Sequence, residues 1–267
     1  MKYTKSRDCI LRMNPSDNVM MEIKKSKEWV KKKRHALTIE QQKAFMTYAK
    51  NSVEFRGWFP MLTVFLGTGC RLGEVLALRW DDLDFEKRTI SINHDVVYRA
   101  LEDEEGVRRS QMHINSPKTE AGKRIIPMID EVYEAFLEEY EIQRCLVDKT
   151  EVIDGYTNFV FTTANGTVFL PQEINRAIKN IYEAYNKEET QLAKEKNREP
   201  ILLPHFSAHH LRHTFCTRFC ENETNLKMIQ EIMGHSDIST TMDVYAEATD
   251  EKKKEILTDL QGKIMVM

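Results

Sequence analysis

The sequence predicts a mostly α-helical protein with a small antiparallel β-sheet inserted early in the chain, an α+β fold. Thr38-Ile39-Glu40-Gln41 forms a capping-box pattern, which is typical of a helix start. Alternating apolar residues between positions 89 and 114 favour paired strands. From Asp130 onward, apolar residues recur at the spacing of one helix face, so most of the remaining chain is expected to be helical.

Two helices are expected after the capping box. Residues 58–66 are almost all apolar, which predicts a buried helix. Gly67 and Gly69 are expected to break this helix, because glycine is a poor helix former. A second helix is expected from about Leu72 to Leu78.

The small sheet is expected to contain three strands. Residues 89–98 predict the first strand, and residues 107–114 predict its return strand. The sequence Asp103-Glu104-Glu105-Gly106 between them is typical of a turn. Residues 124–127 would add a short third strand.

The second half of the chain is expected to be helical around one short buried segment, Phe159-Val160-Phe161. Pro171 is expected at the first position of a helix, where its missing N–H costs nothing. Residues 183–200 are highly charged and are expected to be either a solvated helical extension or a mobile loop. Further helices are expected at about residues 207–221 and 224–233, and from 239 to near the C-terminus.

Composition limits the class of protein. The 267 residues are 41% hydrophobic and 30% charged, which suits one or two compact domains. The sequence has no run of about 18 apolar residues and no signal-peptide core, so an intracellular location is the default expectation. Five cysteines without a CxxC pair do not indicate a disulfide framework. Cys216 and Cys220 are expected to be two buried residues on one helix face rather than a metal or redox pair.

Residues 1–36 resemble a fragment followed by a basic linker, ahead of a main domain at residues 37–267. They hold eleven Lys/Arg and four Asp/Glu, although the whole chain has a net charge of -3. A basic segment beside an acidic body is either an electrostatic contact with DNA or a solvated tail. Charge alone leaves both interpretations open.

Four polar clusters interrupt the apolar helices. Each is weak evidence alone. An arginine at a helix start is usually solvated or salt-bridged, a lone histidine is usually structural, and a tyrosine on an amphipathic helix usually packs its ring. The clusters are residues 67–74 with Arg71, residues 117–119 with Lys118, residues 209–213 with His209 and Arg212, and residues 234–245 with His235 and Tyr245.

Together and in this order, the clusters resemble the tyrosine recombinase (phage integrase) family from about residue 38 to about residue 249. The resemblance rests on the motifs Thr-Gly-x-Arg-x-x-Glu, Pro-Lys-Thr, His-x-x-Arg and Gly-His-Ser. Tyr245 lies ten residues after His235, one more than the common family spacing, and matches the nucleophile. The resemblance implies the tyrosine recombinase catalytic-domain fold and the catalytic residues Arg71, Lys118, His209, Arg212, His235 and Tyr245.

Cleavage of a phosphodiester needs these residue types. Arginine is always charged and binds phosphate oxygens in a fork, so Arg71 and Arg212 can stabilise the negative charge without a metal. A tyrosine hydroxyl has a pKa near 10 in its ordinary state, so Tyr245 needs a base, for which His209 is the candidate. Lys118 can protonate the leaving 5′ oxygen. The resemblance implies a 3′-phosphotyrosine that a 5′ hydroxyl reseals without metal or ATP.

Neighbouring residues have more than one interpretation. His235 is expected to hydrogen-bond the scissile phosphate. A metal site at His209, His210 and His213 is disfavoured, because a His-Glu-x-x-His pattern and nearby acidic ligands are missing. Glu74 is expected to support Arg71 or a helix rather than to act in catalysis.

The resemblance also implies partners: double-stranded DNA at specific sites, a homo-tetramer in the synaptic complex, and an excisionase or DNA-bending accessory protein. Residues 1–36 would be the residual end of a core-binding domain plus its linker. Residues 117–127, 183–200 and 204–216 resemble integrases of conjugative transposons of the Tn916 type more than phage integrases. An active integrase of a mobile element is expected; the alternatives are a truncated, recombination-deficient DNA-binding remnant and a type IB topoisomerase-like enzyme.

Overall fold

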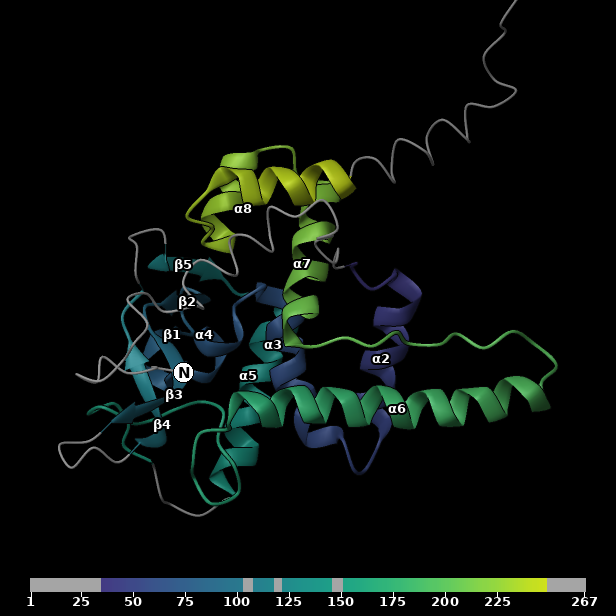
Figure 1. The fold of residues 1–267 in the computed structure, drawn as a ribbon, viewed down its shortest axis with the longest axis horizontal. Coiled ribbons are helices and arrows are strands. Elements are labelled where there is room, and N and C mark those ends of the chain that lie inside the picture. The colour runs from purple at the N-terminus through teal and green to yellow at the C-terminus, as the bar shows by residue number, and fades with distance from the viewer. Residues whose placement is uncertain (1–34, 103–107, 118–121, 146–150, 249–267) are drawn as a thin grey trace, which may run out of the picture. The chain divides into compact units, whose positions relative to one another are not determined.

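The computed structural model of the protein describes residues 35–102, 108–117, 122–145 and 151–248, and Figure 1 shows how their helices and strands are arranged. They belong to one compact unit that begins at His35. Helices dominate this unit, and its strands form two small antiparallel sheets, so the predicted α+β class is confirmed. No helix among the described residues is long and apolar enough to cross a bilayer.

The first helix, α2 (Ile39–Asn51), begins where the capping box predicts. The Thr38 hydroxyl accepts a hydrogen bond from Gln41 N at 3.1 Å, and Gln41 Oε1 accepts one from Thr38 N at 3.1 Å. These two bonds satisfy N–H groups at the helix start. Phe45 and Ala49 form the buried face of α2.

The next helix, α3 (Phe59–Thr68), corrects the prediction about Gly67. Gly67 stays within the helix, because α3 packs closely there against α5 (Asp130–Arg144). A Cβ atom at Gly67 would lie 2.3 Å from Cγ2 of Val132 on α5, which is a steric clash. Only glycine, which has no Cβ atom, fits at this position. α3 is followed by α4 (Leu72–Leu76), which is two residues shorter than predicted. One 3₁₀ turn, η1 (Arg56–Trp58), precedes α3, and another, η2 (Trp80–Asp82), follows α4.

The strands form two sheets where the sequence predicts one. Residues 89–98 do not form a single strand: the chain leaves the first sheet after Ile92 and enters the second at Asp95. The buried residues Ile90, Ile92 and Val96 keep their alternation across this break, so the pattern alone does not reveal it. The strands are β1 (Leu83–Asp84), β2 (Thr89–Ile92) and β5 (Arg124–Pro127) in one sheet, in that order, and β3 (Asp95–Glu102) with β4 (Arg108–Asn115) in the other.

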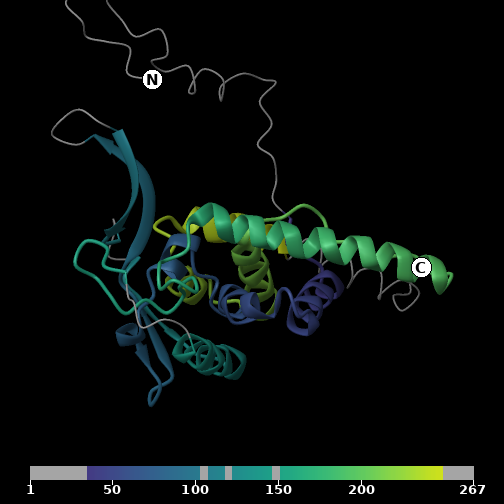
Figure 2. The ribbon, with the colours of Figure 1, turned by 90° about the horizontal axis from the view of Figure 1, so that it is seen from below.

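β3 and β4 form the predicted hairpin, which Figure 2 shows as a long curved ribbon beside the helices. Asp95 pairs with Asn115, and Glu102 pairs with Arg108. The turn predicted at residues 103–106 lies outside the described residues. β5 is the third predicted strand. It does not join the β3–β4 hairpin but pairs with β2 in the three-stranded sheet.

The charged stretch after residue 183 is a helical extension as far as Glu195. It belongs to α6 (Pro171–Glu195), which begins with Pro171 as predicted and reaches past the other helices in Figure 1. The segment that returns from α6 is bound to it by Glu189, which accepts hydrogen bonds from Arg198 Nη1 and Nη2 at 2.5 and 2.8 Å. Of the two predicted alternatives, the structure therefore shows the helix.

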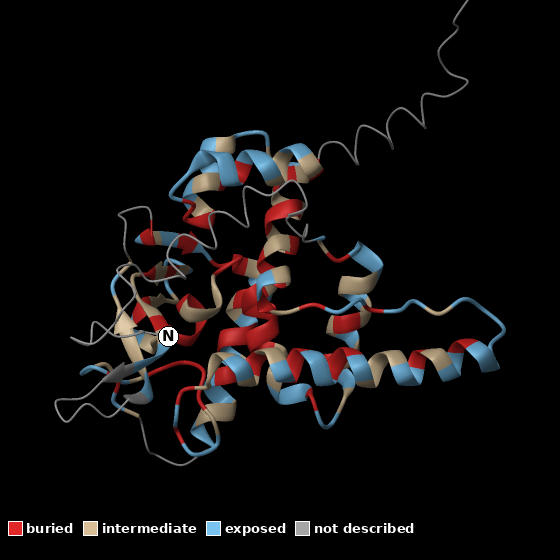
Figure 3. Cartoon of the chain, in the orientation of Figure 1, coloured by how far each residue is buried: buried red, intermediate tan, exposed pale blue. Residues whose placement is uncertain are grey.

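Buried residues gather along α3, α7 (Ala208–Asn222) and the inner half of α6, as Figure 3 shows. The predicted buried segment Phe159-Val160-Phe161 belongs to this main core. α7 lies between α3 and α6 in the fold and contacts both, so it connects the core with the C-terminal helices.

The C-terminal helices have a second, smaller core. They are α8 (Leu226–Met233) and a last helix at residues 238–248. Cys216 and Cys220 on α7 are buried, as predicted for two packing residues. Both pack with Ile229, Met233 and Ala248. This small core fixes the last helix against α7 and α8.

Candidate active site

Two helices end side by side at the candidate site, each at a glycine. α3 ends at Gly69 and α8 ends at Gly234, with φ values of 62° and 63°. A Cβ atom at Gly69 would lie 2.3 Å from Cδ1 of Phe215, so packing as well as backbone geometry requires glycine there. The last carbonyl groups of a helix lack intrahelical partners and carry the negative end of the helix dipole. These two helix ends can therefore bind cations.

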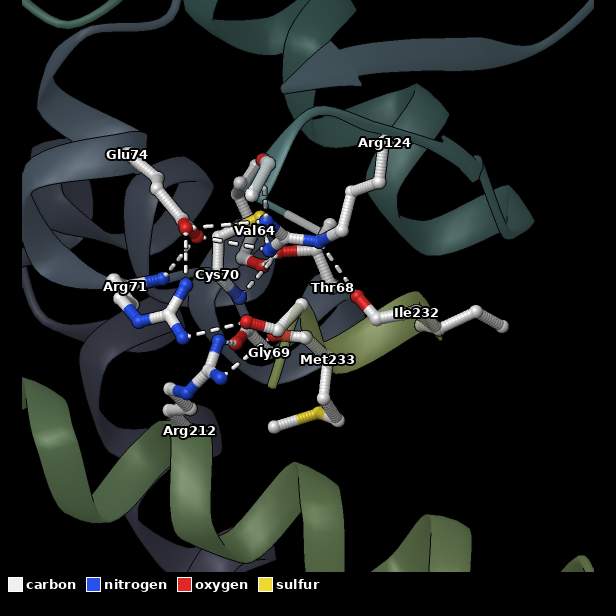
Figure 4. A network of polar contacts seen from close by, with 12 residues as sticks. Val64, Thr68, Gly69, Cys70, Arg71, Glu74, Arg124, Arg212, Ile232 and Met233 are labelled. Atoms are coloured by element: carbon white, nitrogen blue, oxygen red, sulfur yellow. Dashed lines mark hydrogen bonds and ion pairs between the residues drawn. The ribbon is translucent and has the colours of Figure 1, made fainter. Parts of the chain in front are cut away.

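Arg212 of α7 occupies the space between the two helix ends. Its Nη1 donates to Gly69 O at 2.6 Å and its Nη2 donates to Met233 O at 2.7 Å, as Figure 4 shows. The side chain is buried. Burial, and then the charge of Arg71, lower the pKa of Arg212 to about 10, so it remains a cation at neutral pH.

Arg71 lies beside Arg212 and is the N-cap residue of α4. Its Nη1 donates to Glu74 Oε1 at 2.6 Å, and its Nη2 donates to Gly234 O at 2.7 Å. Its backbone N–H also donates to Glu74 Oε2, at 2.8 Å. Glu74 thus holds Arg71, which agrees with the supporting role expected for this carboxylate.

Sequence reasoning noted Arg124 only as the start of a short strand after Lys118 and did not assign it to the site, but Arg124 joins the same network from β5. Its Nη1 and Nη2 donate to the two oxygens of Glu74 at 3.1 and 2.8 Å, and its Nε donates to Ile232 O at 2.7 Å. Burial alone would raise the pKa of Glu74, but Arg124 and then Arg71 lower it to about 2. Glu74 is therefore an ionised counter-ion. The one local signal for Arg124 is a charged residue in an otherwise apolar strand.

His235 follows the glycine that ends α8 and is buried. Its Nδ1 lies 3.0 Å from Oγ1 of Thr241 on the last helix. Burial, followed by the charges of Arg212, Arg71 and Arg124, lowers the pKa of His235 to about 4. His235 is therefore neutral at pH 7, with one ring nitrogen that donates and one that accepts.

Of the remaining predicted residues, the structure describes His209 and Tyr245. His209 is exposed in the first turn of α7, one helical turn before Arg212. Tyr245 is partly buried against the small C-terminal core. It lies four residues after Thr241, so both occupy one face of the last helix. Lys118 lies outside the described residues. The structure thus brings Arg71, Arg212 and His235 together. His209 lies on α7, the helix of Arg212, and Tyr245 lies on the last helix, at residues 238–248.

The chemical character of the centre is positive. The cluster combines three guanidinium groups with the carboxylate of Glu74, which pairs with two of them, so these four side chains carry two positive charges in excess. Among the described residues, no three His, Cys, Asp or Glu side chains form a group that would hold a metal ion. Such a centre suits an anion such as a phosphate group.

The sequence and the fold agree with one family. The model of the phage integrase family matches residues 35–252. The chain belongs to the phage integrase family. The predicted family resemblance and catalytic-domain fold are both confirmed.

Two relatives within the phage integrase family illustrate the match. The transposase from transposon Tn916 of Enterococcus faecalis is 34% identical over 213 residues, which cover 80% of this chain and 48% of the relative. A XerC-like tyrosine recombinase of Caldanaerobacter subterraneus is 30% identical over 202 residues, which cover 73% of this chain and 47% of the relative. The chain therefore spans about half the length of the curated relatives that it matches.

Two solved structures share the fold of this chain. The Tn1549 transposon integrase in complex with transposon right end DNA superposes with a TM-score of 0.70 and 30% identity, covering 94% of this chain and 73% of that one. The XerA recombinase shares the fold at a TM-score of 0.58 and 18% identity, covering 86% of this chain and 66% of that one.

Proposed function

We propose that the chain is the catalytic part of a site-specific DNA recombinase, an integrase that integrates or excises a mobile element. In this proposal Tyr245 attacks a DNA phosphate and forms a 3′-phosphotyrosine. The observation that carries the proposal is the convergence of Arg71 and Arg212 on the ends of α3 and α8, next to His235. The likeness to an integrase solved with transposon end DNA supports it.

The first step is binding of the scissile phosphate by the two arginines. A guanidinium has five N–H donors. Within the described residues, the side chains of Arg71 and Arg212 each donate two hydrogen bonds, which leaves three donors on each for a ligand. The helix-end carbonyls hold both groups in place before the substrate arrives. Pre-positioned charge of this kind stabilises the negative oxygens of the transition state.

Proton transfers complete the reaction. The Tyr245 oxygen forms a bond with phosphorus while the bond to the 5′ oxygen breaks. His209 accepts the proton from Tyr245, and Lys118 gives one to the leaving 5′ oxygen. His235, neutral at pH 7, donates a hydrogen bond to a phosphate oxygen. The phosphotyrosine keeps the energy of the broken ester, so a 5′ hydroxyl from another duplex reseals it without ATP.

The proposed reaction needs no metal ion, because the two arginines supply the charge that a metal would supply elsewhere. Cleavage is therefore expected to proceed at the same rate in the presence of EDTA.

Covalent trapping tests the proposal. The unaltered chain would be incubated with a nicked duplex that carries the end sequence of its mobile element, and adducts would be resolved on denaturing gels. We expect an adduct from the unaltered chain and from a control, Tyr140→Phe, whose tyrosine is exposed on α5. Tyr245→Phe is expected to form none. An adduct that persists in Tyr245→Phe would overturn the assignment of the nucleophile. DNA binding without any adduct would favour the non-recombining DNA-binding alternative.

Replacing Thr241 with valine is expected to slow adduct formation by about 3- to 10-fold, a loss of roughly 1 kcal/mol that matches one hydrogen bond. Valine has nearly the same shape but cannot bind Nδ1 of His235, so the ring loses the contact that fixes its orientation. Single-turnover rates would measure the effect. Thr240→Val, at an exposed position on the same helix, serves as the control; an equal loss in both variants would contradict the role of Thr241.

The proposal includes partners. We propose that the protein binds double-stranded DNA at specific sites and that four protomers act on two duplexes. An excisionase or a DNA-bending protein assists them. The reaction takes place in the bacterial cytoplasm, at the nucleoid. Residues 1–36 would be the end of a core-binding domain with its basic linker, and residues 37–267 would be the catalytic domain. Light scattering of the DNA complex tests the tetramer.

A further inference from the structure

The three arginines of the site differ in how their donors are used. Arg124 donates from Nε to Ile232 O, from Nη1 to Glu74 Oε1 and more weakly to Gly122 O at 3.4 Å, and from Nη2 to Glu74 Oε2 and to Cys70 Sγ at 3.7 Å. All five of its N–H donors therefore have partners. Its side chain is 6% exposed, whereas that of Arg71 is 41% exposed. Arg124 thus has no donor left for DNA.

We propose that Arg124 is a positioning residue of the phosphate site, which acts on DNA cleavage through Glu74 and Arg71. It binds both oxygens of Glu74 and so fixes the carboxylate that orients Arg71. This inference rests on the proposed function, because it assigns Arg124 a role in the same reaction.

The contacts of Glu74 show how Arg124 reaches Arg71. Each Glu74 oxygen accepts one hydrogen bond from Arg124 and one from Arg71, at 2.6 to 3.1 Å. Arg124 thereby shares the Glu74 carboxylate with Arg71. Because Arg124 occupies both oxygens, Glu74 does not bind both Nη groups of Arg71. Without Arg124, a buried and ionised Glu74 would have Arg71 as its remaining strong partner. The Arg71 guanidinium would then turn toward Glu74 and away from the phosphate.

A second contact connects Arg124 with the end of α8. Ile232, whose carbonyl accepts from Arg124 Nε, directly precedes the two residues whose carbonyls hold the other arginines. These are Met233, which binds Arg212, and Gly234, which binds Arg71. Figure 4 shows the whole network from Arg124 through Glu74 to Arg71. Arg124 therefore fixes both groups that hold Arg71: the Glu74 carboxylate and the end of α8.

A double-mutant cycle tests this inference. Single-turnover adduct formation at saturating nicked element-end duplex would be measured for Arg124→Met alone, for Arg71→Ala alone and for the two together. In the unaltered background Arg124→Met is expected to lower the rate by roughly 30- to 100-fold, in the range of coupled active-site residues. In the Arg71→Ala background it is expected to lower the rate by no more than about threefold, because the residue through which it acts is gone.

Two further variants separate positioning from general stability. Arg198→Met breaks another arginine pair with a buried carboxylate, Glu189, in the outer half of α6. That half of α6 lies on the opposite side of the fold from β5 in Figure 1. Arg198→Met is expected to leave the rate unchanged. Arg124→Lys keeps the charge and is expected to recover part of the rate, although lysine cannot bind both Glu74 oxygens in a fork. Melting temperatures would show that each variant is folded at the assay temperature.

The outcomes are distinct. Equal fractional losses from Arg124→Met in both backgrounds would overturn the positioning role alone. A wild-type rate for Arg124→Met would do the same. Failure of the unaltered chain to form any adduct would overturn the proposed function and this inference with it.

Discussion

Arg212→Lys is expected to lower the rate of phosphotyrosine formation by roughly 100- to 1,000-fold, the usual loss when one donor to a developing oxyanion is removed. Arg212 spans two helix ends because its planar guanidinium presents Nη1 to Gly69 O and Nη2 to Met233 O. Lysine carries a single ammonium group, which cannot bind both carbonyls and also present two parallel donors to a phosphate. The charge would remain, but its position would change.

The measurement is single-turnover adduct formation with a nicked duplex, together with DNA affinity and melting temperature. Arg218→Lys provides a matched control on the same helix, because Arg218 also joins a backbone carbonyl, that of Leu37, but lies outside the arginine cluster. The control is expected to retain its cleavage rate. A loss smaller than about fivefold for Arg212→Lys would mean that charge alone, without the fork, is sufficient.

The motif residues could be predicted from the sequence because each lies in a distinctive local structure. Gly69 ends α3 and Arg71 begins α4 within one short motif, and Gly234 and His235 form another at the end of α8. Their meeting in space is a long-range event. The bond from Arg71 Nη2 to Gly234 O joins residues 163 positions apart.

Arg124 and Thr241 could not be predicted in the same way. Arg124 matters because of Glu74 and Ile232, which lie 50 and 108 positions away. Thr241 matters because it faces the ring of His235. The local sequence shows only that Arg124 is a charged residue in an apolar strand, which does not reveal its partners, and Thr241 stands out by no pattern at all. Lys118 was predicted from its motif, and its catalytic role remains a prediction.

The fold differs from the prediction where a local preference and long-range packing disagree. Glycine weakens a helix locally, yet α3 continues through Gly67 because the helix packs there against α5. Val132 of α5 fills the space that a side chain at Gly67 would need. The strand pattern of residues 89–98 continues across a break at Asn93 and His94, because both sheets bury alternate residues. Periodicity reports which side of a strand is buried, but not to which sheet it belongs.

Glu139→Gln is expected to stabilise the protein by on the order of 2–4 kcal/mol at pH 8 and by much less at pH 5. Glu139 lies on the buried face of α5 with Val132, Ala135 and Phe136. Burial, and then the charge of Glu138, raise the pKa of Glu139 to about 8. In the unfolded chain the same group ionises near pH 4.3. The folded state therefore keeps a proton that the unfolded state releases.

The sign of the effect follows from this difference. Between about pH 4.3 and pH 8 the unfolded state binds fewer protons than the folded state, so the free energy of unfolding falls as pH rises through this window. Glutamine cannot ionise and removes that loss. Urea unfolding followed by circular dichroism at pH 5 and pH 8 would measure it. Glu134→Gln, at an exposed position on the same helix, is the control and is expected to change the free energy of unfolding by less than about 0.5 kcal/mol. A stabilisation by Glu139→Gln of the same size at both pH values would mean that Glu139 titrates as an exposed carboxyl does.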